Sequence, residues 1–466
     1  MFKPKTYIER RNILKQQVGS GVILLLGNGE APMNYPANTY QFRQDSTFLY
    51  YFGLDLPGLA AMIDIEKNEE LLFGDDFTVE DIVWMGPQPP FSEIAEKAGI
   101  SRTFPVSRLK ERIQAVLRGK RKVHYIPQYR AENAVKISGL CSSIPVPEVN
   151  KKASVKLIKV ISSQRAIKSG EEVEQIEMAL DIAYDMYALA MKLAEPGMYE
   201  YEVAGAIEGL RSARGSESPF PTILTVHGEV LHGHSHRNRM KAGDLLVIDA
   251  GAESLLHYAS DSTRTIPIGG CFNTMQKDIY SVVLGAQLSA ISMMNPGVLF
   301  RDVHLRAAGE IAKGMKNLGF MRGDPAEAVK AGAHALFFPH GLGHLLGLDV
   351  HDMENLGENL VGYDAAVKRS SQFGFAYLRF AKKLEPGMVM TVEPGIYFMP
   401  ELIGQWKSKK KFEEFINYTA IEKKLGGFGG IRIEDDVLIT ESGSRVLGKP
   451  IAKTVEEIEI ICGKKA

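Results

Sequence analysis

The stretch KAGDLLVIDAG, residues 241–251, has a counterpart in EPGMVMTVEPG, residues 385–395. In both, a glycine precedes a five-residue, mostly apolar run of strand length, which ends at an acid with another glycine two residues further on. A second pair, EPGMYEYEV (195–203) and NPGVLFRDV (295–303), follows a helical run in each case. The two pairs predict a duplicated helix–turn–helix–strand unit, and therefore a pseudo-twofold C-terminal domain.

Four acids end or interrupt apolar runs in this part of the chain. Asp249 and Glu393 end the two matching strands, so we expect them to face each other, and Asp261 and Glu434 lie in HYASDSTRTI and GIRIEDDVLI. A carboxylate inside an apolar strand costs too much free energy to remain unpaired. Either each acid has an arginine partner or the acids share cations. Arg432 is the one suitable arginine nearby, and we expect it to pair with Asp249, since one arginine cannot neutralise four acids.

Three of the 11 histidines of the chain lie in PHGLGHLLGLDVHD, residues 339–352, namely His340, His344 and His351. On a helix these offsets share about one face, but three glycines weaken helix formation, so only part of the stretch is predicted to be helical. Four carboxylates with one imidazole form a hard-oxygen site that suits two divalent ions such as Mn²⁺, Zn²⁺, Co²⁺ or Fe²⁺. The glutamate that would complete a zincin motif is absent, and the three cysteines lack CxxC spacing.

The first 160 residues have the pattern of an α/β domain. GVILLLG, LAAMIDI, ELLFG and KVHYIP are predicted strands, separated by charged helical stretches such as VSRLKERIQAVLRG. Ser169 and Glu172 form a predicted capping box at the start of a long helix with an apolar stripe. We therefore predict an α/β (α+β) protein with domains at 1–165 and 166–466.

Composition argues against several classes of partner. The 466 residues include 55 basic and 56 acidic side chains, a balance that disfavours nucleic-acid binding. The basic run at 407–411 alternates with acidic neighbours and is interpreted as a solvated face. The N-terminus has no apolar signal core, and the run VILLL is too short to span a membrane. A cytoplasmic protein without membrane or nucleic-acid partners is predicted.

Seven motifs follow one another through nearly the whole chain: YQFRQDSTFLYYFGL (40–54), VLHGHSHRN, VIDAG, ASDSTRT, PHGLGHLLGLDVHD, LEPGMVMTVEPGIY and GGIRIEDDVLIT. With them the sequence resembles the pita-bread metallopeptidases, in particular the proline-specific branch of Xaa-Pro aminopeptidase (aminopeptidase P) and Xaa-Pro dipeptidase (prolidase). The resemblance implies a creatinase-like N-terminal α/β domain of the aminopeptidase P type and a pseudo-twofold pita-bread catalytic domain.

The resemblance also implies a dinuclear metal site. Asp249 matches the acid that chelates one metal, and Asp261 and Glu434 match acids that bridge both. His344 and Glu393 match ligands of the second metal. Two divalent ions, Mn²⁺ first among the alternatives, would acidify a shared water to hydroxide, and Glu393 would pass its proton to the leaving nitrogen. The interval from Asp249 to Asp261 is one residue longer than usual in the family, so the loop between them is expected to bulge.

Further residues are assigned roles around this site. His232, His340 and His351 match three active-site histidines that do not bind metal, and the latter two are expected to donate to the oxyanion and the substrate. Arg379 is a candidate substrate residue, Tyr397 is either core or substrate-contacting, and Arg432 supports the site. His234 and His236 are expected to face solvent.

The resulting prediction is a metallo-aminopeptidase that cleaves peptides with proline at the second position. Prolidase is the alternative, since Arg379 suits a free proline carboxylate and the insert at 399–428 is prolidase-like. A non-catalytic binding module and a metal-free creatinase-like enzyme are rivals that should have lost ligands, whereas all five candidates are present. The family further implies a homodimer or homotetramer, although the sequence shows no interface.

Overall fold

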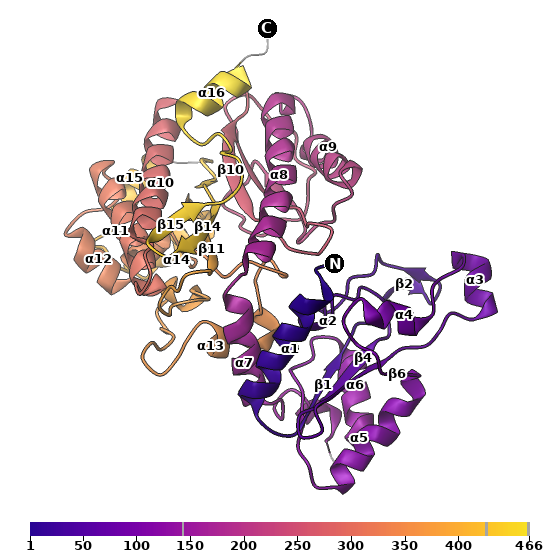
Figure 1. The fold of residues 1–466 in the computed structure, drawn as a ribbon. Helices are drawn as coiled ribbons and strands as arrows, with labels where there is room; N and C mark the ends of the chain where they lie inside the picture. The colour runs from indigo at the N-terminus through magenta and orange to yellow at the C-terminus, as the bar shows by residue number, and fades with distance from the viewer. Residues whose placement is uncertain (142–143, 425–426, 464–466) are drawn as a thin grey trace. The chain divides into compact units, whose positions relative to one another are not determined.

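The computed structural model describes residues 1–141, 144–424 and 427–463, which form two compact units (Figure 1). Unit 1 consists of Met1–Arg165 and Met353–Val361, and unit 2 of Ala166–Asp352 and Gly362–Ala466. The short segment 353–361 thus belongs to unit 1, whereas the predicted boundary at 165/166 placed it in the second domain. Over the described ranges, no helix has both the length and the apolarity needed to cross a bilayer.

Unit 1 is built on a five-stranded mixed sheet in the order β6-β5-β4-β1-β7. Its strands are β1 (Val22–Leu26), β4 (Ala60–Asp64), β5 (Glu69–Phe73), β6 (Thr103–Phe104) and β7 (Val123–His124). The pairs β1–β4 and β4–β5 are antiparallel, whereas β1–β7 and β5–β6 are parallel. All four apolar runs predicted as strands are confirmed, because each supplies one buried strand of this sheet.

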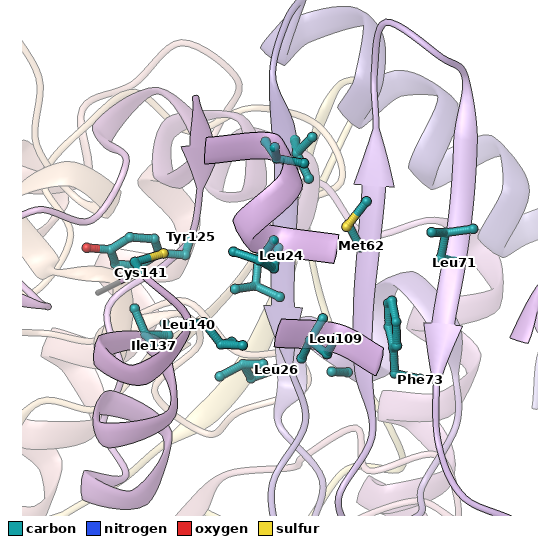
Figure 2. Packing of buried hydrophobic residues seen from close by; sticks show 14 of the residues in the cluster. Leu24, Leu26, Met62, Leu71, Phe73, Leu109, Tyr125, Ile137, Leu140 and Cys141 are labelled. Carbon is teal, nitrogen blue, oxygen red and sulfur yellow. The ribbon is translucent and has the colours of Figure 1, made fainter. Parts of the chain in front are cut away.

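Helices and one small hairpin complete unit 1. They are α1 (Pro4–Val18), β2 (Pro32–Tyr35), β3 (Asn38–Thr39), α2 (Ser46–Phe52), α3 (Val79–Met85), α4 (Phe91–Glu96), η1 (Val106–Arg108), α5 (Leu109–Arg118), α6 (Ala131–Leu140), η2 (Val146–Glu148), α7 (Val155–Ala166), η4 (Glu354–Leu356) and α13 (Glu358–Val361). Leu24 and Phe73 from the sheet pack with Leu109 of α5 and Ile137 of α6 (Figure 2). Burial of these side chains is the main stabilising contribution to the unit.

Unit 2 contains two helix pairs and short antiparallel sheets. The helices are α8 (Gly170–Leu193), α9 (Glu200–Ala213), α10 (Thr274–Met293), α11 (Phe300–Asn317), α12 (Pro325–Ala331), η3 (Ala333–Leu336), η5 (Phe375–Tyr377), α14 (Pro400–Ser408), α15 (Tyr418–Lys424) and α16 (Val455–Gly463). The strands are β8 (Ile223–Thr225), β9 (Leu245–Ala250), β10 (Ser262–Pro267), β11 (Val389–Val392), β12 (Gly395–Tyr397), β13 (Gly430–Arg432), β14 (Asp435–Thr440) and β15 (Gly443–Val446). The sheets have the orders β10-β9-β8, β11-β14-β15 and β12-β13.

The predicted duplication is visible in this order of elements. Helices α8 and α9 precede β9, and helices α10 and α11 precede β11, so the two motif pairs occupy equivalent places. The predicted capping box starts α8, with the Ser169 side chain accepting from the Glu172 backbone N–H and the Glu172 carboxylate accepting from the Ser169 N–H. The halves meet where Glu434 N–H donates to the Thr263 carbonyl over 3.0 Å.

The histidine-rich stretch 339–352 contains neither helix nor strand, so the prediction of a partly helical segment is wrong. Its backbone instead bonds to the region of β11: the Thr391 N–H donates to the His344 carbonyl over 2.9 Å, and the Glu393 N–H donates to the Leu342 carbonyl over 2.8 Å. A Cβ at Gly343 would collide with the Thr391 carbonyl. The glycines therefore permit close approach to the strand, which competes successfully with helix formation.

Candidate active site

A cavity of about 580 Å³ opens within unit 2. Its walls include both apolar and ionisable side chains: Phe220, Pro221, Ile223, Leu231, His232, His234, Asp249, Asp261, Pro339, His340, Gly341, Gly343, His344, Val350, His351, Phe373, Tyr377, Arg379, Glu393, Met399, Arg432 and Glu434. Four acids and a histidine expected from the sequence are among them. A concave site with convergent ionisable groups is the usual form of an active site.

The four acids reach the cavity from the ends of strands in both halves of the unit. Asp249 lies near the end of β9, Asp261 directly precedes β10, Glu393 directly follows β11, and Glu434 lies between β13 and β14. His344 Nε2 is 3.5 Å from Asp261 Oδ2 and 3.6 Å from Glu393 Oε1. Potential ligand atoms of Asp261, His344 and Glu434 all lie within 4.8 Å of one another. The fold thus gathers residues that are up to 185 positions apart in the sequence.

These acids are an electrostatically unfavourable group on their own. Burial raises the pKa of Asp261, Glu393 and Glu434 well above the ordinary range, and the negative charges of the neighbouring carboxylates raise it further. Within the described part of the chain, the buried Oδ1 of Asp261 finds no hydrogen-bond partner. Cations bound among the oxygens would remove both costs, so the donor set fits divalent metal ions.

Arg432 neutralises one of the acids. Its Nη2 donates to Asp249 Oδ2 over 2.6 Å, which is the ion pair expected from the sequence. Its Nη1 donates to the hydroxyl of Tyr397 over 3.0 Å. Tyr397 is fully buried and is not among the residues lining the cavity, which favours the core alternative, and contact with substrate stays a prediction. The phenol lies behind the cavity wall, and its hydroxyl bonds to two residues of that wall, Arg432 and His340.

His340 is held by two hydrogen bonds. Burial, and then the positive charge of Arg432, lower its pKa to about 3, so the ring is neutral. Its Nδ1 lies 2.8 Å from the Gly341 carbonyl and therefore donates to it. Its Nε2 lies 2.9 Å from the Tyr397 hydroxyl and accepts from it. Both ring nitrogens are engaged, so this arrangement leaves His340 no free N–H for an oxyanion, in contrast to the sequence-based expectation.

His344 has a different orientation. Its Nδ1 lies 3.0 Å from the Leu345 carbonyl, to which it donates, and its backbone N–H donates to the Thr391 hydroxyl over 3.0 Å. Nε2 consequently presents a lone pair to the acids, as a metal ligand requires. The ring of His351 packs edge-on against this ring, with 4.4 Å between the centroids and 69° between the planes.

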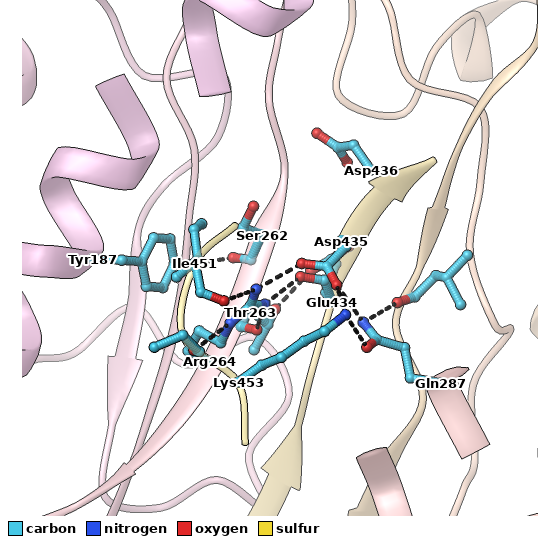
Figure 3. A network of polar contacts seen from close by, with 12 residues as sticks. Tyr187, Ser262, Thr263, Arg264, Gln287, Glu434, Asp435, Asp436, Ile451 and Lys453 are labelled. Carbon is cyan, nitrogen blue, oxygen red and sulfur yellow. Dashed lines mark hydrogen bonds and ion pairs between the residues drawn. The ribbon is translucent and has the colours of Figure 1, made fainter. Parts of the chain in front are cut away.

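Asp435 and Asp436, next to Glu434, belong to a polar network whose role was not predicted from the sequence (Figure 3). Asp435 accepts from Arg264 Nη2 and Lys453 Nζ, both over 2.6 Å. Burial alone would raise the pKa of Asp435, but the two cations hold it below its ordinary value. The run EDD at the start of a buried strand was the available signal, because successive residues of a strand face opposite sides and cannot all point into the cavity.

Two further bonds connect this network to the candidate ligands. Asp436 Oδ2 accepts from the backbone N–H of Asp261 over 3.0 Å. The Thr263 hydroxyl donates to Glu434 Oε2 over 2.6 Å. Residues from β10 and β14 therefore fix each other's acids, so the orientation of the group depends on contacts between the two halves of unit 2.

The remaining residues with predicted roles lie in or near the wall. His234 lines the cavity and is exposed, in line with the solvent-facing expectation, whereas His236 is partly buried and its Nε2 bonds to the Thr222 carbonyl at 3.1 Å. Arg379 is half-buried in the wall. In the loop after Asp249, His257 adopts a positive φ of 66° and bonds to Glu253 over 2.6 Å.

Residues 174–441 match the family described as metallopeptidase family M24, and residues 7–125 match the family described as aminopeptidase P, N-terminal domain. The chain therefore belongs to metallopeptidase family M24. It is 30% identical to Xaa-Pro aminopeptidase of Escherichia coli K12, over 97% of this chain and 96% of that protein. It is 33% identical to human Xaa-Pro dipeptidase, over 95% and 89% of the two chains.

A solved structure has the same overall arrangement. Zn-substituted E. coli aminopeptidase P in complex with product superposes with a TM-score of 0.80 at 27% identity, over 99% of this chain and 98% of that one. The predicted family and fold class are confirmed, because both the N-terminal and the catalytic regions match. As a member of this family the chain is a metallopeptidase that uses divalent metal ions.

Proposed function

We propose that this protein is an Xaa-Pro aminopeptidase, which hydrolyses the bond between an N-terminal residue and a following proline. The observation that carries the proposal is the group of four acids and His344 in a cavity of the M24 domain. The name of the E. coli relative, which matches both units, supports the proline specificity. The retained acids argue against a non-catalytic or metal-free member of the fold.

In this proposal Asp249, Asp261, His344, Glu393 and Glu434 hold two divalent ions, with Mn²⁺ as the favoured metal. The fit rests on Asp261 Oδ1, which has no hydrogen-bond partner among the described residues, and on four carboxylates that the single charge of Arg432 cannot neutralise. A ligand set of four carboxylates and one imidazole favours Mn²⁺ over metals that prefer thiolate ligands. When bound, the ions would acidify a water molecule and polarise the scissile carbonyl.

The protein's own groups orient the substrate and move protons. Glu393, at the end of β11, would accept a proton and deliver it to the leaving proline nitrogen. His232 and His351 line the same cavity and would donate to the substrate backbone. We assign His340 to positioning instead, since Tyr397 and Gly341 occupy its two nitrogens.

Metal removal tests the proposal directly. Chelator-treated protein should lose cleavage of an Xaa-Pro-Yaa peptide and regain it with Mn²⁺, with two metal equivalents returning. Elemental analysis supplies a readout independent of turnover. Full activity of protein shown to be metal-free would contradict the dinuclear site and favour the creatinase-like alternative.

Prolidase activity is the second candidate, and Arg379 is the observation that favours it. A guanidinium in the cavity wall suits the free carboxylate of an Xaa-Pro dipeptide. The human dipeptidase relative supports the same candidate. A preference for a dipeptide over the corresponding tripeptide, lost in Arg379→Ala, would establish this alternative.

We further propose a homodimer or homotetramer. Helix α3 of unit 1 has no buried residue, and Val79, Val83 and Trp84 on it are 79%, 73% and 81% exposed. An exposed apolar cluster of this kind suits a second copy of the chain. Light scattering should show an oligomer that Trp84→Asp weakens, and a monomeric wild type would contradict it. Division into domains 1–165 and 166–466 and a cytoplasmic location stay predictions.

A further inference from the structure

Two aromatic side chains of the cavity wall are much more exposed to solvent than the acids of the same wall. Phe373 and Tyr377 line the cavity, yet they are 37% and 56% exposed. Asp261 and Glu434, also in the lining, are only 5% and 2% exposed. The acids therefore form the floor of the cavity, whereas the aromatic pair lies at its mouth.

The insert that follows β12 holds the ring of Phe373, and Phe373 in turn packs against Tyr377. The ring of Phe373 packs edge-on against Tyr377 at 6.0 Å and against Trp406 of α14 at 5.9 Å. Trp406 is 4% exposed and packs against Phe412 at 5.5 Å. Lys411 Nζ lies 3.8 Å from the centre of the Trp406 ring, a cation–π contact that covers the cluster on that side.

The residue midway between the two rings packs towards the core. Phe375 is partly buried and stacks on the buried His304 at 5.2 Å with 26° between the rings. The Tyr377 N–H donates to the carbonyl of Gly374 over 3.2 Å, within a short 3₁₀ turn. The stacking of Phe375 and this turn hold the segment in place, with Phe373 and Tyr377 exposed on either side of Phe375.

The chemistry of an aminopeptidase determines what passes this mouth. An enzyme that removes one N-terminal residue holds the amino end and the scissile bond at the metal floor, so the rest of the peptide leaves through the opening. Proline has its own φ fixed near the polyproline II value, which favours an extended peptide whose side chains can reach the wall of the opening. Exposed aromatic faces there bind apolar side chains favourably.

Resting on the proposed aminopeptidase function, we infer that Phe373 and Tyr377 form a subsite for an apolar residue after proline. Among Xaa-Pro-Yaa peptides, the preferred substrates are thus those in which Yaa is apolar. Trp406 and Lys411 are positioning residues for the subsite, since they touch Phe373 and not the cavity.

The test compares Xaa-Pro-Leu with Xaa-Pro-Gly on the metal-loaded full-length enzyme. Wild type should have the higher kcat/KM for the leucine peptide, and Tyr377→Ala should reduce the ratio of the two values about threefold to tenfold, mainly through KM. Tyr377→Phe keeps the ring and should keep the ratio. Tyr201→Ala is the matched control, because Tyr201 is 53% exposed on α9 and lies outside the cavity lining.

The outcomes separate this inference from the function on which it rests. Equal ratios for wild type and Tyr377→Ala, with both tripeptides cleaved, would overturn the subsite and leave the aminopeptidase proposal intact. Cleavage of Xaa-Pro dipeptides alone would overturn the subsite and establish a dipeptidase. No cleavage of any Xaa-Pro peptide by metal-loaded wild type would overturn both proposals. A reduced ratio in Tyr377→Ala that Tyr377→Phe restores would establish the subsite.

Discussion

Replacing Lys168 by methionine should lower the free energy of unfolding of unit 2 far more than the same replacement of an exposed lysine. Lys168 Nζ lies 3.0 Å from Asp352 Oδ2, and both side chains are only 1% exposed. The lysine backbone N–H donates to the Gly387 carbonyl over 2.8 Å, just before α8. The residue therefore joins the start of that helix to the end of the histidine-rich stretch.

The magnitude follows from the burial of both charges. Methionine approximates the lysine stem but removes the Lys168 cation from the buried Asp352 carboxylate, and breaking a buried pair in this way costs about 3–5 kcal/mol. Little room remains for a water molecule that could solvate the carboxylate. The backbone of Gly347 packs so closely that a Cβ there would lie 2.6 Å from Asp352 Oδ2. The Asp352 N–H donates to the Leu345 carbonyl over 2.9 Å, so a displaced aspartate would also disturb neighbouring His351 and lower kcat.

Urea unfolding followed by tryptophan fluorescence measures this loss in unit 2, where Trp406 is 4% exposed. Lys449→Met is the matched control: its pair with Asp181 at 3.1 Å has side chains 59% and 44% exposed, so its loss should cost less than about 1 kcal/mol. The double variant Lys168→Met/Asp352→Leu should recover most of the stability, because it leaves no unpaired charge. A double variant as unstable as Lys168→Met, or a single variant no worse than the control, would refute the reasoning.

Three more predictions concern the site and its surroundings. Glu434→Gln should lose metal as well as turnover, whereas His351→Ala should retain metal and lose about 10²-fold in kcat; metal loss in His351→Ala would show that ligand and helper are assigned wrongly. Tyr397→Phe should lower kcat/KM about tenfold without changing the folded content by circular dichroism, since only the hydroxyl between Arg432 and His340 is removed; wild-type rates would exclude a role for that bond. Acid should destabilise unit 2 through His304, because burial lowers the pKa of this residue in the folded protein from 6.5 to about 3. Below pH 6.5 the unfolded chain takes up a proton at this histidine and the folded chain does not. The contribution of His304 to stability is therefore full above pH 6.5 and falls as the pH drops towards 3. His304→Phe should make the urea midpoint less dependent on pH between 7.5 and 5, and an unchanged dependence would contradict this assignment.

Local features of the fold were predictable because they depend on neighbouring residues. The apolar runs of unit 1 became β1, β4, β5 and β7, and the capping box at Ser169 starts α8, since strand periodicity and helix capping act over a few positions. The positions of Asp249 and Glu393 at strand ends followed from the repeated motif. Their approach to one another followed from the duplication that the repeat implies.

The orientation of individual side chains depended on contacts that no local pattern encodes. Whether Tyr397 faces the cavity or the core was settled by Arg432 and His340, which lie 35 positions after it and 57 positions before it in the chain. The helix expected within 339–352 was replaced by backbone bonds to Thr391 and Glu393.

The amino-acid sequence by itself determined the two α/β units, the repeat, and the set of acids and histidines that the catalytic region brings to its strand ends. Tertiary structure alone decided which nitrogen of His344 faces the acids, that Asp436 holds the backbone of Asp261, and that Phe373 and Tyr377 stand at the mouth. The physical reason is the range of the interactions. Periodicity and capping are set within one or two turns of chain, whereas ring orientation and buried charge pairing are set by whichever distant residues share the same volume.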